Sequence, residues 1–276
     1  MLTGRRCAVL GSPVAHSLSP VIHRAAYEWL GLDWRYEAVE VDEAGFDGFV
    51  AGLDGSWRGL SCTMPLKEVA ALAGTPDEDV VLTGAANTVL LDAPRSVHNT
   101  DIPGLIDAFR AAGVAEVRHA AILGNGATAR SAVVALARLG ARWVTVLGRN
   151  PERVGQLVTW ARDAGLPASA GAWSDGVPGE AEALVSTVPA AAAATVLPAT
   201  APAPEGRLRA VFDVIYHPWP TPLAAAAQAS GVLTLNGLDL LVHQAAHQLK
   251  HMTGQIVPVS VLESAVRAEV LRRSAT

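Results

Sequence analysis

Apolar positions in the first hundred residues follow strand and helix periods in turn. Buried runs or alternating patterns predict strands over residues 5–10, 34–41 and 57–63. Between the first two strands, Ser19 is expected to be a helix N-cap and Pro20 to occupy the first helical position. The apolar positions that follow recur at helical spacing: Ile22, Ala25, Ala26, Trp29 and Leu30. This succession of strands and helices indicates an α/β layer.

The alternation continues beyond residue 101. Residues 120–140 predict a buried strand, a glycine turn and a long helix, and three further strands follow. Residues 191–206, rich in alanine and proline, predict a short helix and a surface loop. We therefore expect two α/β domains, over 1–101 and 102–236, and C-terminal helices over 237–276 that pack back on the first domain.

Composition narrows the class of protein. Half of the 276 residues are hydrophobic and 17% are charged, which is too apolar for a disordered chain, yet no run approaches the roughly 20 apolar residues of a membrane span. The net charge of −5 leaves no overall basic footprint for nucleic acid. Two cysteines cannot form a disulfide framework, and the N-terminus does not resemble a signal peptide. We expect a cytoplasmic monomer or homodimer with no nucleic-acid or membrane partner.

A glycine turn carries the clearest chemical signal. Gly124, Gly126 and Ala129 form a G-x-G-x-x-A pattern, with Asn125, Ala127 and Thr128 between them, after one predicted strand and before a helix. Such a turn lets the backbone and the helix N-terminus approach a pyrophosphate. The plain alternative is a glycine turn that binds nothing. The flanking strand and helix favour a dinucleotide and make 102–236 a doubly wound, Rossmann-type domain.

The next strand indicates which dinucleotide is bound. An NAD site would place an acidic residue about 20 residues after the glycines, on the ribose 2′-hydroxyl. Here Arg149, Asn150 and Arg153 follow that strand, and arginine pairs well with a 2′-phosphate. A solvated basic turn is the alternative, and Glu152 weakens the argument slightly. The pattern predicts NADP as the cofactor.

The first domain contains polar residues that a substrate could use. Ser17 and Ser19 stand at a predicted strand-to-helix turn, where they could bind a carboxylate or simply cap the helix. Lys67 falls in the first turn of a helix that Pro65 is expected to start. That placement is poor for stability but useful for proton transfer. From this motif alone, a lysine extended into solvent is the simpler interpretation.

Two polar motifs and a row of histidines complete the set. Asn87 could order a turn and Asp101 could cap a helix, or Asp101 could hold an ammonium group in place. His243, His247 and His251 recur every four residues on one predicted helix, a spacing that can bind a metal ion. We interpret them as the polar flank of that helix and expect no metal.

Taken together, these motifs resemble the shikimate dehydrogenase family across nearly the whole chain. The matching segments are GSPVAHSLSP at 11–20, TMPLK at 63–67, GAANT at 84–88, NTDIPG at 99–104, GNGATA at 124–129, DVIYHPWPTPL at 213–223 and NGLDLLVHQ at 236–244. The resemblance implies the reversible NADP-linked reduction of 3-dehydroshikimate to shikimate in aromatic amino acid biosynthesis. It also implies a first domain that binds the substrate.

The resemblance assigns roles by position. Lys67 and Asp101 would be the catalytic pair. The substrate-binding residues would be Ser17, Ser19 and Tyr216 at the carboxylate, and Thr63, Asn87 and Gln244 at the ring hydroxyls. The cofactor-binding residues would be the glycine turn at 124–129, Arg149, Asn150, Arg153, Thr187 and Gly237.

Some positions depart from the family pattern. The family usually has Asn at Ser61, Gly at His98 and a glycine after Pro189, and often Met at Leu240. Two alternatives therefore stay open: a quinate or broad-specificity dehydrogenase, and a non-catalytic NADP-binding sensor on the same fold.

Overall fold

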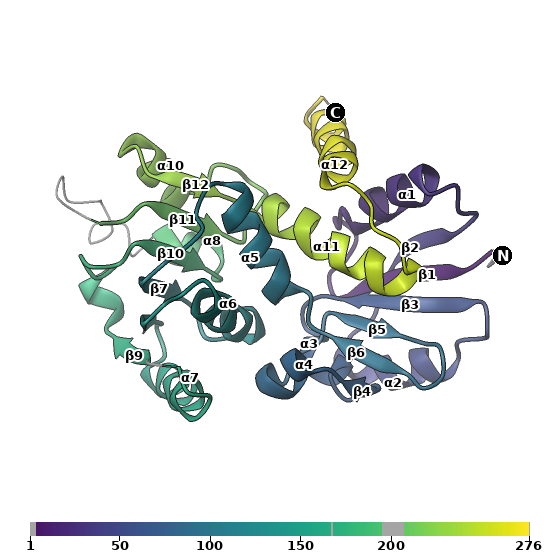
Figure 1. Cartoon of the computed structure of the whole chain (residues 1–276), viewed down its shortest axis with the longest axis horizontal. Coiled ribbons are helices and arrows are strands. Elements are labelled where there is room, and N and C mark those ends of the chain that lie inside the picture. The colour runs from purple at the N-terminus through teal and green to yellow at the C-terminus, as the bar shows by residue number, and fades with distance from the viewer. Residues whose placement is uncertain (1–3, 167, 195–206, 276) are drawn as a thin grey trace. The chain divides into compact units, whose positions relative to one another are not determined.

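The computed structural model describes residues 4–166, 168–194 and 207–275, and the chain divides into two compact α/β units (Figure 1). Unit 1 comprises Met1–Gly104 and Leu241–Thr276, and unit 2 comprises Leu105–Leu240. The chain passes from one unit to the other within two helices, α5 (Asp101–Ala111) and α11 (Gly237–Thr253).

Unit 1 is built on a mixed sheet with the strand order β2-β1-β3-β5-β6-β4. The strands are β1 (Arg6–Gly11), β2 (Arg35–Glu40), β3 (Trp57–Cys62), β4 (Thr75–Pro76), β5 (Thr88–Leu90) and β6 (Ser96–His98). Strands β1, β2 and β3 pair in parallel, whereas β5 runs antiparallel to both of its neighbours. The C-terminal ends of β1, β3 and β6 and the N-terminal end of β5 therefore lie at the same end of the strands, which we call the carboxyl end of the unit 1 sheet.

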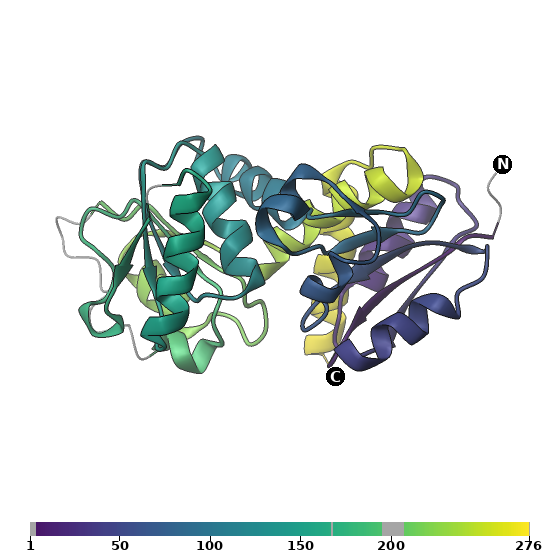
Figure 2. The ribbon, with the colours of Figure 1, turned by 90° about the horizontal axis from the view of Figure 1, so that it is seen from below.

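Helices cover both faces of this sheet. The helices of unit 1 besides α5 and α11 are α1 (Ser19–Trp29), α2 (Glu43–Ala51), α3 (Lys67–Ala70), α4 (Glu78–Thr83) and α12 (Val259–Ser274). Phe46, Leu66 and Val80 bring α2, α3 and α4 into one apolar core with the sheet. On the opposite face His23 of α1 stacks on Tyr36, and Gln248 of α11 bonds Ser61. Helix α12 packs against α1 (Figure 2), which confirms that the C-terminal helices return to the first domain.

Unit 2 contains an all-parallel sheet with the strand order β12-β11-β10-β7-β8-β9. The strands are β7 (His119–Leu123), β8 (Trp143–Leu147), β9 (Ala168–Gly171), β10 (Ala183–Ser186), β11 (Ala210–Asp213) and β12 (Leu233–Leu235). The order reverses between β7 and β10, as in a doubly wound dinucleotide fold. The predicted fold class is confirmed.

Helices also lie on both faces of the second sheet. They are α6 (Ala127–Arg138), α7 (Pro151–Asp163), α8 (Ala190–Ala193) and α10 (Pro222–Ala229), with the short 3₁₀ helix η1 (Trp173–Asp175). Ala193 of α8 and Leu223 of α10 share a core with Val211 of β11. Phe212, the next residue of that strand, points the other way and contacts Phe109 of α5 with ring centres 5.3 Å apart.

Two predicted details of helix α1 were wrong. Leu18, not Ser19, is the N-cap, and Ser17 Oγ accepts a hydrogen bond from the Ser19 amide at 3.2 Å. The buried face includes His23 and Tyr27, while Trp29 is 52% exposed, because the aromatic cluster around Tyr36 draws that side of the helix inward. The predicted loop at 195–206 lies outside the described residues. None of the helices within the described residues combines the length and apolar character of a membrane span.

Candidate active site

The catalytic residues that the sequence predicts come together at the carboxyl end of the unit 1 sheet. Leu10 pairs with Cys62 near the ends of β1 and β3, and Thr88, at the start of β5, pairs with both Ser61 and His98. Lys67 follows β3, Asn87 directly precedes β5 and Asp101 follows β6, so all three lie in segments at this end of the strands. In sheets of this type, ligands bind at the carboxyl ends of the strands.

Lys67 and Asp101 form a direct ion pair. Lys67 Nζ lies 2.5 Å from Asp101 Oδ2, and the two side chains are 16% and 6% exposed. Lys67 begins α3, and its carbonyl accepts a hydrogen bond from the Ala86 amide at 2.8 Å. Asp101 begins α5, where its carboxylate is favourable beside the helix N-terminus. The solvent-exposed lysine that the motif alone favoured is therefore wrong.

Asn87 holds the carboxylate of this pair from the other side. Its Nδ2 donates to Asp101 Oδ1 at 2.8 Å and to Gln244 Oε1 at 3.3 Å. Its Oδ1 accepts from the Thr100 amide at 2.9 Å, the Thr100 hydroxyl at 3.0 Å and the Thr88 hydroxyl at 2.9 Å. The amide is thus engaged on both ends, so Asn87 fixes the direction in which Asp101 faces Lys67.

Gln244 is buried within the same network. It is 7% exposed, and its Nε2 donates to the Leu241 carbonyl at 2.8 Å while its Oε1 faces Asn87 and Thr100. The backbone of α11 can pack this closely against α5 because residue 104 is glycine: a Cβ added to Gly104 would be 2.8 Å from the Gln244 backbone nitrogen. Gln244, which the resemblance assigns to a ring hydroxyl, thus lies buried beside Asn87.

A second buried glutamine supports the network, and the sequence did not predict it. Gln248 Nε2 donates to the Asn87 carbonyl at 2.9 Å and to the Thr88 hydroxyl at 3.0 Å. Its Oε1 accepts from Ser61 Oγ at 2.8 Å, and Ser61 accepts from the Tyr36 hydroxyl at 2.6 Å. The only signal in the sequence was a second glutamine four residues after Gln244, on the same helix face. Ser61, where the family usually has Asn, is therefore paired and buried.

The other predicted substrate residues of unit 1 lie in the segments that follow β1 and β3, at the same carboxyl end of the sheet. The Gly11 and Thr63 segments touch, since a Cβ on Gly11 would lie 2.4 Å from the Thr63 methyl group. Ser17 is partly buried, and Ser19 is 5% exposed. The substrate-binding roles of Ser17, Ser19 and Thr63 stay predictions.

His98, where the family usually has Gly, also has partners. His98 Nδ1 lies 2.9 Å from Asp77 Oδ2, and the ring stacks on His251 with centres 4.1 Å apart. Burial, followed by the neighbouring His98, lowers the pKa of His251 to about 4. Burial raises the pKa of Asp77, but hydrogen bonds from His98 and the Val80 amide outweigh it and leave that pKa below its ordinary value. His98 thus ties the end of β6 to α4 and α11.

In unit 2, the glycine turn has the form that a pyrophosphate requires. Gly124 has φ +116°, and a Cβ there would lie 2.2 Å from Thr187 Oγ1. Gly126 is the N-cap of α6, has no side-chain cap, and has nothing within 4 Å of a Cβ position. Thr187 Oγ1 donates to the Leu123 carbonyl at 2.9 Å, which fixes the neighbouring segment. The open side of Gly126 and the α6 N-terminus fit a bound diphosphate.

The residues after β8 fit a phosphate on the adenosine ribose. Arg149 and Arg153 are exposed, and neither guanidinium forms a hydrogen bond or ion pair with another described residue. Asn150 caps α7, where its Oδ1 accepts from the Arg153 amide at 3.1 Å. Both arginines therefore keep their donors for a ligand.

Gly237 and Tyr216 lie side by side in unit 2. A Cβ on Gly237 would lie 2.1 Å from the Val214 carbonyl oxygen and 3.1 Å from the Tyr216 ring. Glycine at 237 thus has a packing reason that is independent of any cofactor. In the altered segment after β10, Ala190 begins α8 directly after Pro189. Within the described residues, no group of three or more His, Cys, Asp or Glu side chains is placed to hold a metal ion.

Two family models match the chain. The shikimate dehydrogenase substrate binding domain matches residues 9–89, and the Shikimate 5'-dehydrogenase C-terminal domain matches residues 237–267. The shikimate dehydrogenase (NADP(+)) of Methanocella arvoryzae is 35% identical over 262 residues, which are 94% of this chain and 97% of that protein.

Solved structures agree with these matches. The shikimate dehydrogenase of Mycobacterium tuberculosis superimposes with a TM-score of 0.87 and 38% identity, over 96% of this chain and 99% of that one. The shikimate 5-dehydrogenase of Thermus thermophilus, solved in complex with NADP(H) and shikimate, gives a TM-score of 0.80 and 32% identity, over 96% and 99%. With relatives this similar over nearly its whole length, the chain belongs to the shikimate dehydrogenase family.

Proposed function

We propose that the protein catalyses the reversible, NADP-linked interconversion of 3-dehydroshikimate and shikimate. The observation that carries the proposal is the Lys67–Asp101 ion pair, held by Asn87 at the carboxyl end of the unit 1 sheet. A protein that only sensed NADP would not need a proton donor and its orienting carboxylate there. The Thermus thermophilus relative solved with NADP(H) and shikimate supports the same substrate and cofactor.

Lys67 supplies the proton in this proposal. As an ammonium group it polarises the ketone oxygen and donates a proton as negative charge develops there. Asp101 accepts a hydrogen bond from Lys67 through Oδ2 and from Asn87 through Oδ1, so the ammonium stays aimed in one direction. In the reverse reaction the neutral amine accepts the hydroxyl proton.

Binding of the substrate uses hydroxyl and amide groups around this pair. The hydroxyls of Ser17 and Ser19 bind the carboxylate near the α1 N-terminus. Gln244 and Thr63 bind ring hydroxyl groups. Gln244 Nε2 keeps one N–H beyond its bond to the Leu241 carbonyl, whereas Asn87 already donates both of its N–H groups, so Asn87 contributes mainly by orienting Asp101. A cradle of neutral donors suits a small polyhydroxy acid.

Unit 2 holds the dinucleotide in this proposal. The α6 N-terminus at Gly126 binds the diphosphate, and Arg149 and Arg153 bind the 2′-phosphate. When bound, NADPH supplies the hydride that reduces the ketone carbon, so the residues of the chain need only position the substrate and move a proton.

The test measures NADPH formation from shikimate in Lys67→Ala and Asp101→Ala variants, with Lys250→Ala as the matched control. Lys250 is the only other lysine of the chain and is exposed. We expect kcat to fall at least about 100-fold in both active-site variants, since positioned acid–base groups contribute about 10²–10⁴-fold. NADP binding, measured by fluorescence titration, should stay near wild type.

Near-normal turnover in both variants would refute the roles of the pair. A parallel assay with quinate addresses substrate choice: quinate turnover equal to that of shikimate would make the protein a broad-specificity dehydrogenase. Tight NADP binding with no turnover of either acid would refute the enzymatic proposal.

A further inference from the structure

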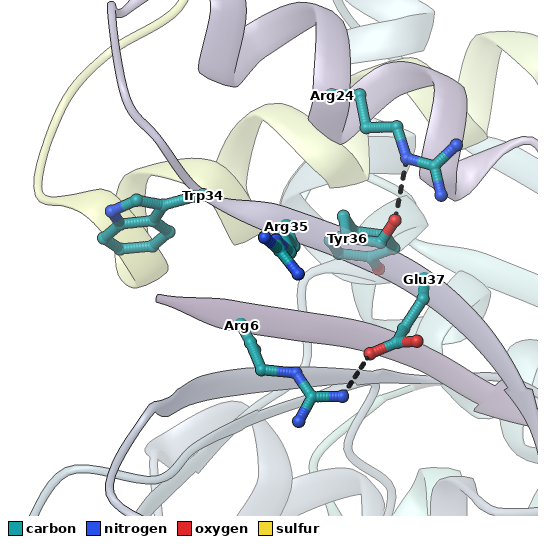
Figure 3. A pocket seen from close by; sticks show the side chains of 6 residues that line it. All are labelled: Arg6, Arg24, Trp34, Arg35, Tyr36 and Glu37. Carbon is teal, nitrogen blue, oxygen red and sulfur yellow. Dashed lines mark hydrogen bonds and ion pairs between the residues drawn. The ribbon is translucent and has the colours of Figure 1, made fainter. Parts of the chain in front are cut away.

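Unit 1 has a hollow on its surface, away from the Lys67–Asp101 pair, that is lined by charged side chains. Its volume is about 570 Å³, and its lining residues are Arg6, Arg24, Trp34, Arg35, Tyr36 and Glu37. Figure 3 shows Arg24 of α1 on one side, Arg6 of β1 on the other and Arg35 of β2 between them. Three arginines and one glutamate give the hollow a net charge of +2 if all are ionised.

The three arginines differ in how many of their guanidinium donors already have a partner. Arg6 Nη2 lies 2.8 Å from Glu37 Oε1, so this charge is largely neutralised. Arg24 donates through Nε to the Tyr36 carbonyl at 2.8 Å, which fixes the guanidinium while leaving its two terminal nitrogens available (Figure 3). Arg35 is exposed, and its side chain forms no hydrogen bond or ion pair with another described residue. The hollow thus offers two guanidinium groups with open donors.

The backbone of β2 adds a further donor. Strand β2 is at the edge of its sheet, paired only with β1. The Arg35 amide donates to the Arg5 carbonyl at 2.9 Å, so the Arg35 peptide faces β1. Successive residues of a strand alternate in direction, so the Tyr36 N–H points away from β1, beside the carbonyl that Arg24 binds. Donors from two side chains and one peptide converge on the same edge.

The hollow lies at the opposite end of the strands from the candidate active site. Arg6 and Arg35 are the first residues of β1 and β2, and β1 ends at Gly11, beside Thr63. Five steps at about 3.3 Å per residue separate Arg6 from Gly11 by roughly 16 Å. A ligand in the hollow is therefore distinct from the substrate and does not depend on the proposed function.

We propose that this hollow binds inorganic phosphate in its dianionic form. Planar guanidinium forks match the oxygens of phosphate, and a dianion balances the net charge of +2. Glu37 opposes extended polyanions such as nucleic acid, as does the chain's net charge of −5. The volume suits a small molecule.

The test is isothermal titration calorimetry with inorganic phosphate at constant ionic strength. It uses the full chain in an Arg149→Ala/Arg153→Ala background, which removes the arginines expected to bind the cofactor phosphate. We expect saturable binding at one site, weakened at least tenfold by Arg35→Ala and by Arg24→Ala. Arg95→Ala, a change at another exposed arginine of unit 1, should leave the affinity unchanged.

Three results would overturn the proposal. They are no saturable binding, binding that survives Arg35→Ala unchanged, and succinate binding as tightly as phosphate. Arg24→Ala removes a hydrogen bond to the backbone, so its folding is checked by circular dichroism. Arg35→Glu provides a second variant at an exposed side chain and should abolish binding.

Discussion

Replacing Gln248 with leucine should destabilise unit 1 and slow turnover, because this side chain joins the sheet to the hydrogen-bond network around the Lys67–Asp101 pair. Gln248 is 1% exposed. It donates to the Asn87 carbonyl and the Thr88 hydroxyl, and it accepts from Ser61. Leucine has a similar size but none of these groups, so the change removes three hydrogen bonds and leaves little empty space.

The three bonds do not contribute equally to the free energy of unfolding. The Asn87 carbonyl keeps a second donor, the Cys62 amide at 2.8 Å, and the Thr88 hydroxyl keeps Asn87 Oδ1 as its acceptor. The Ser61 hydroxyl loses its acceptor, and an unsatisfied buried donor costs about 1–3 kcal/mol. With about 1 kcal/mol for each other bond, less roughly 1 kcal/mol for the more apolar leucine, the expected loss is about 2–4 kcal/mol.

Urea unfolding measures this loss, and a double-mutant cycle with Ser61→Ala isolates the shared bond. The double variant should be about 1–2 kcal/mol more stable than the sum of the single losses predicts, because the Ser61–Gln248 bond can be lost only once. Met252→Leu, a swap of similar volume on the same helix, is the control and should cost less than about 1.5 kcal/mol.

The kinetic consequence separates positioning from mere stability. Asn87 directs Asp101, so a displaced Asn87 backbone should lower kcat several-fold at temperatures where the variant is fully folded, with a smaller change in KM. A variant that unfolds at the wild-type midpoint, or losses that add without coupling, would refute the role assigned to Gln248.

Two further predictions concern pH and the cofactor. Burial lowers the pKa of His23 from 6.5 to about 4, so the unfolded chain takes up a proton that the folded chain excludes, and stability should fall by about 3 kcal/mol as the pH drops from 6.5 to 4. His23→Phe, which keeps the stacking on Tyr36, should flatten this dependence in urea unfolding at several pH values, and an unchanged slope would contradict the prediction. Replacing Arg149 and Arg153 together by alanine should raise KM for NADP at least tenfold and leave KM for NAD nearly unchanged, since only NADP carries the 2′-phosphate. An equal rise for both cofactors in steady-state assays would show that the arginines do not bind that phosphate.

The glycine turn of unit 2 and the elements beside it were predictable from the sequence because their signals are local, whereas the short outer strands β9 and β12 were not predicted. The strand, Gly124, Gly126 and the following helix are contiguous, and the reasons for each are chemical requirements of a tight turn. In unit 1 the strands β1 to β3 were predicted within a residue or two, but the β5–β6 hairpin was not. Each of its strands has three residues, too few to show a period.

The candidate site was harder to predict because its contacts join distant parts of the chain. Lys67 and Asp101 are 34 residues apart, and Gln248 bonds Ser61 across 187 residues. Taken alone, Lys67 had a simple solvent-exposed interpretation and Asp101 a simple capping one, and the resemblance to a family identified the two as a catalytic pair. Gln248 belonged to no motif, so its role emerged only when α11 was placed against the sheet.

Because α5 and α11 each run through a unit boundary, exchanging unit 2 between relatives would require joints inside helical turns rather than in loops. The Gly104 amide, for example, bonds the Thr100 carbonyl at 3.0 Å, right at the first boundary. At 3.6 residues per turn, one extra residue inserted after Leu240 would rotate the following side chains by about 100° about the helix axis. Gln244, Gln248 and the groups they bond all belong to unit 1, so this rotation would oppose the bonds of α11 in unit 1 to its continuation into unit 2. Any chimaeric protein must therefore preserve helical phase at both joints.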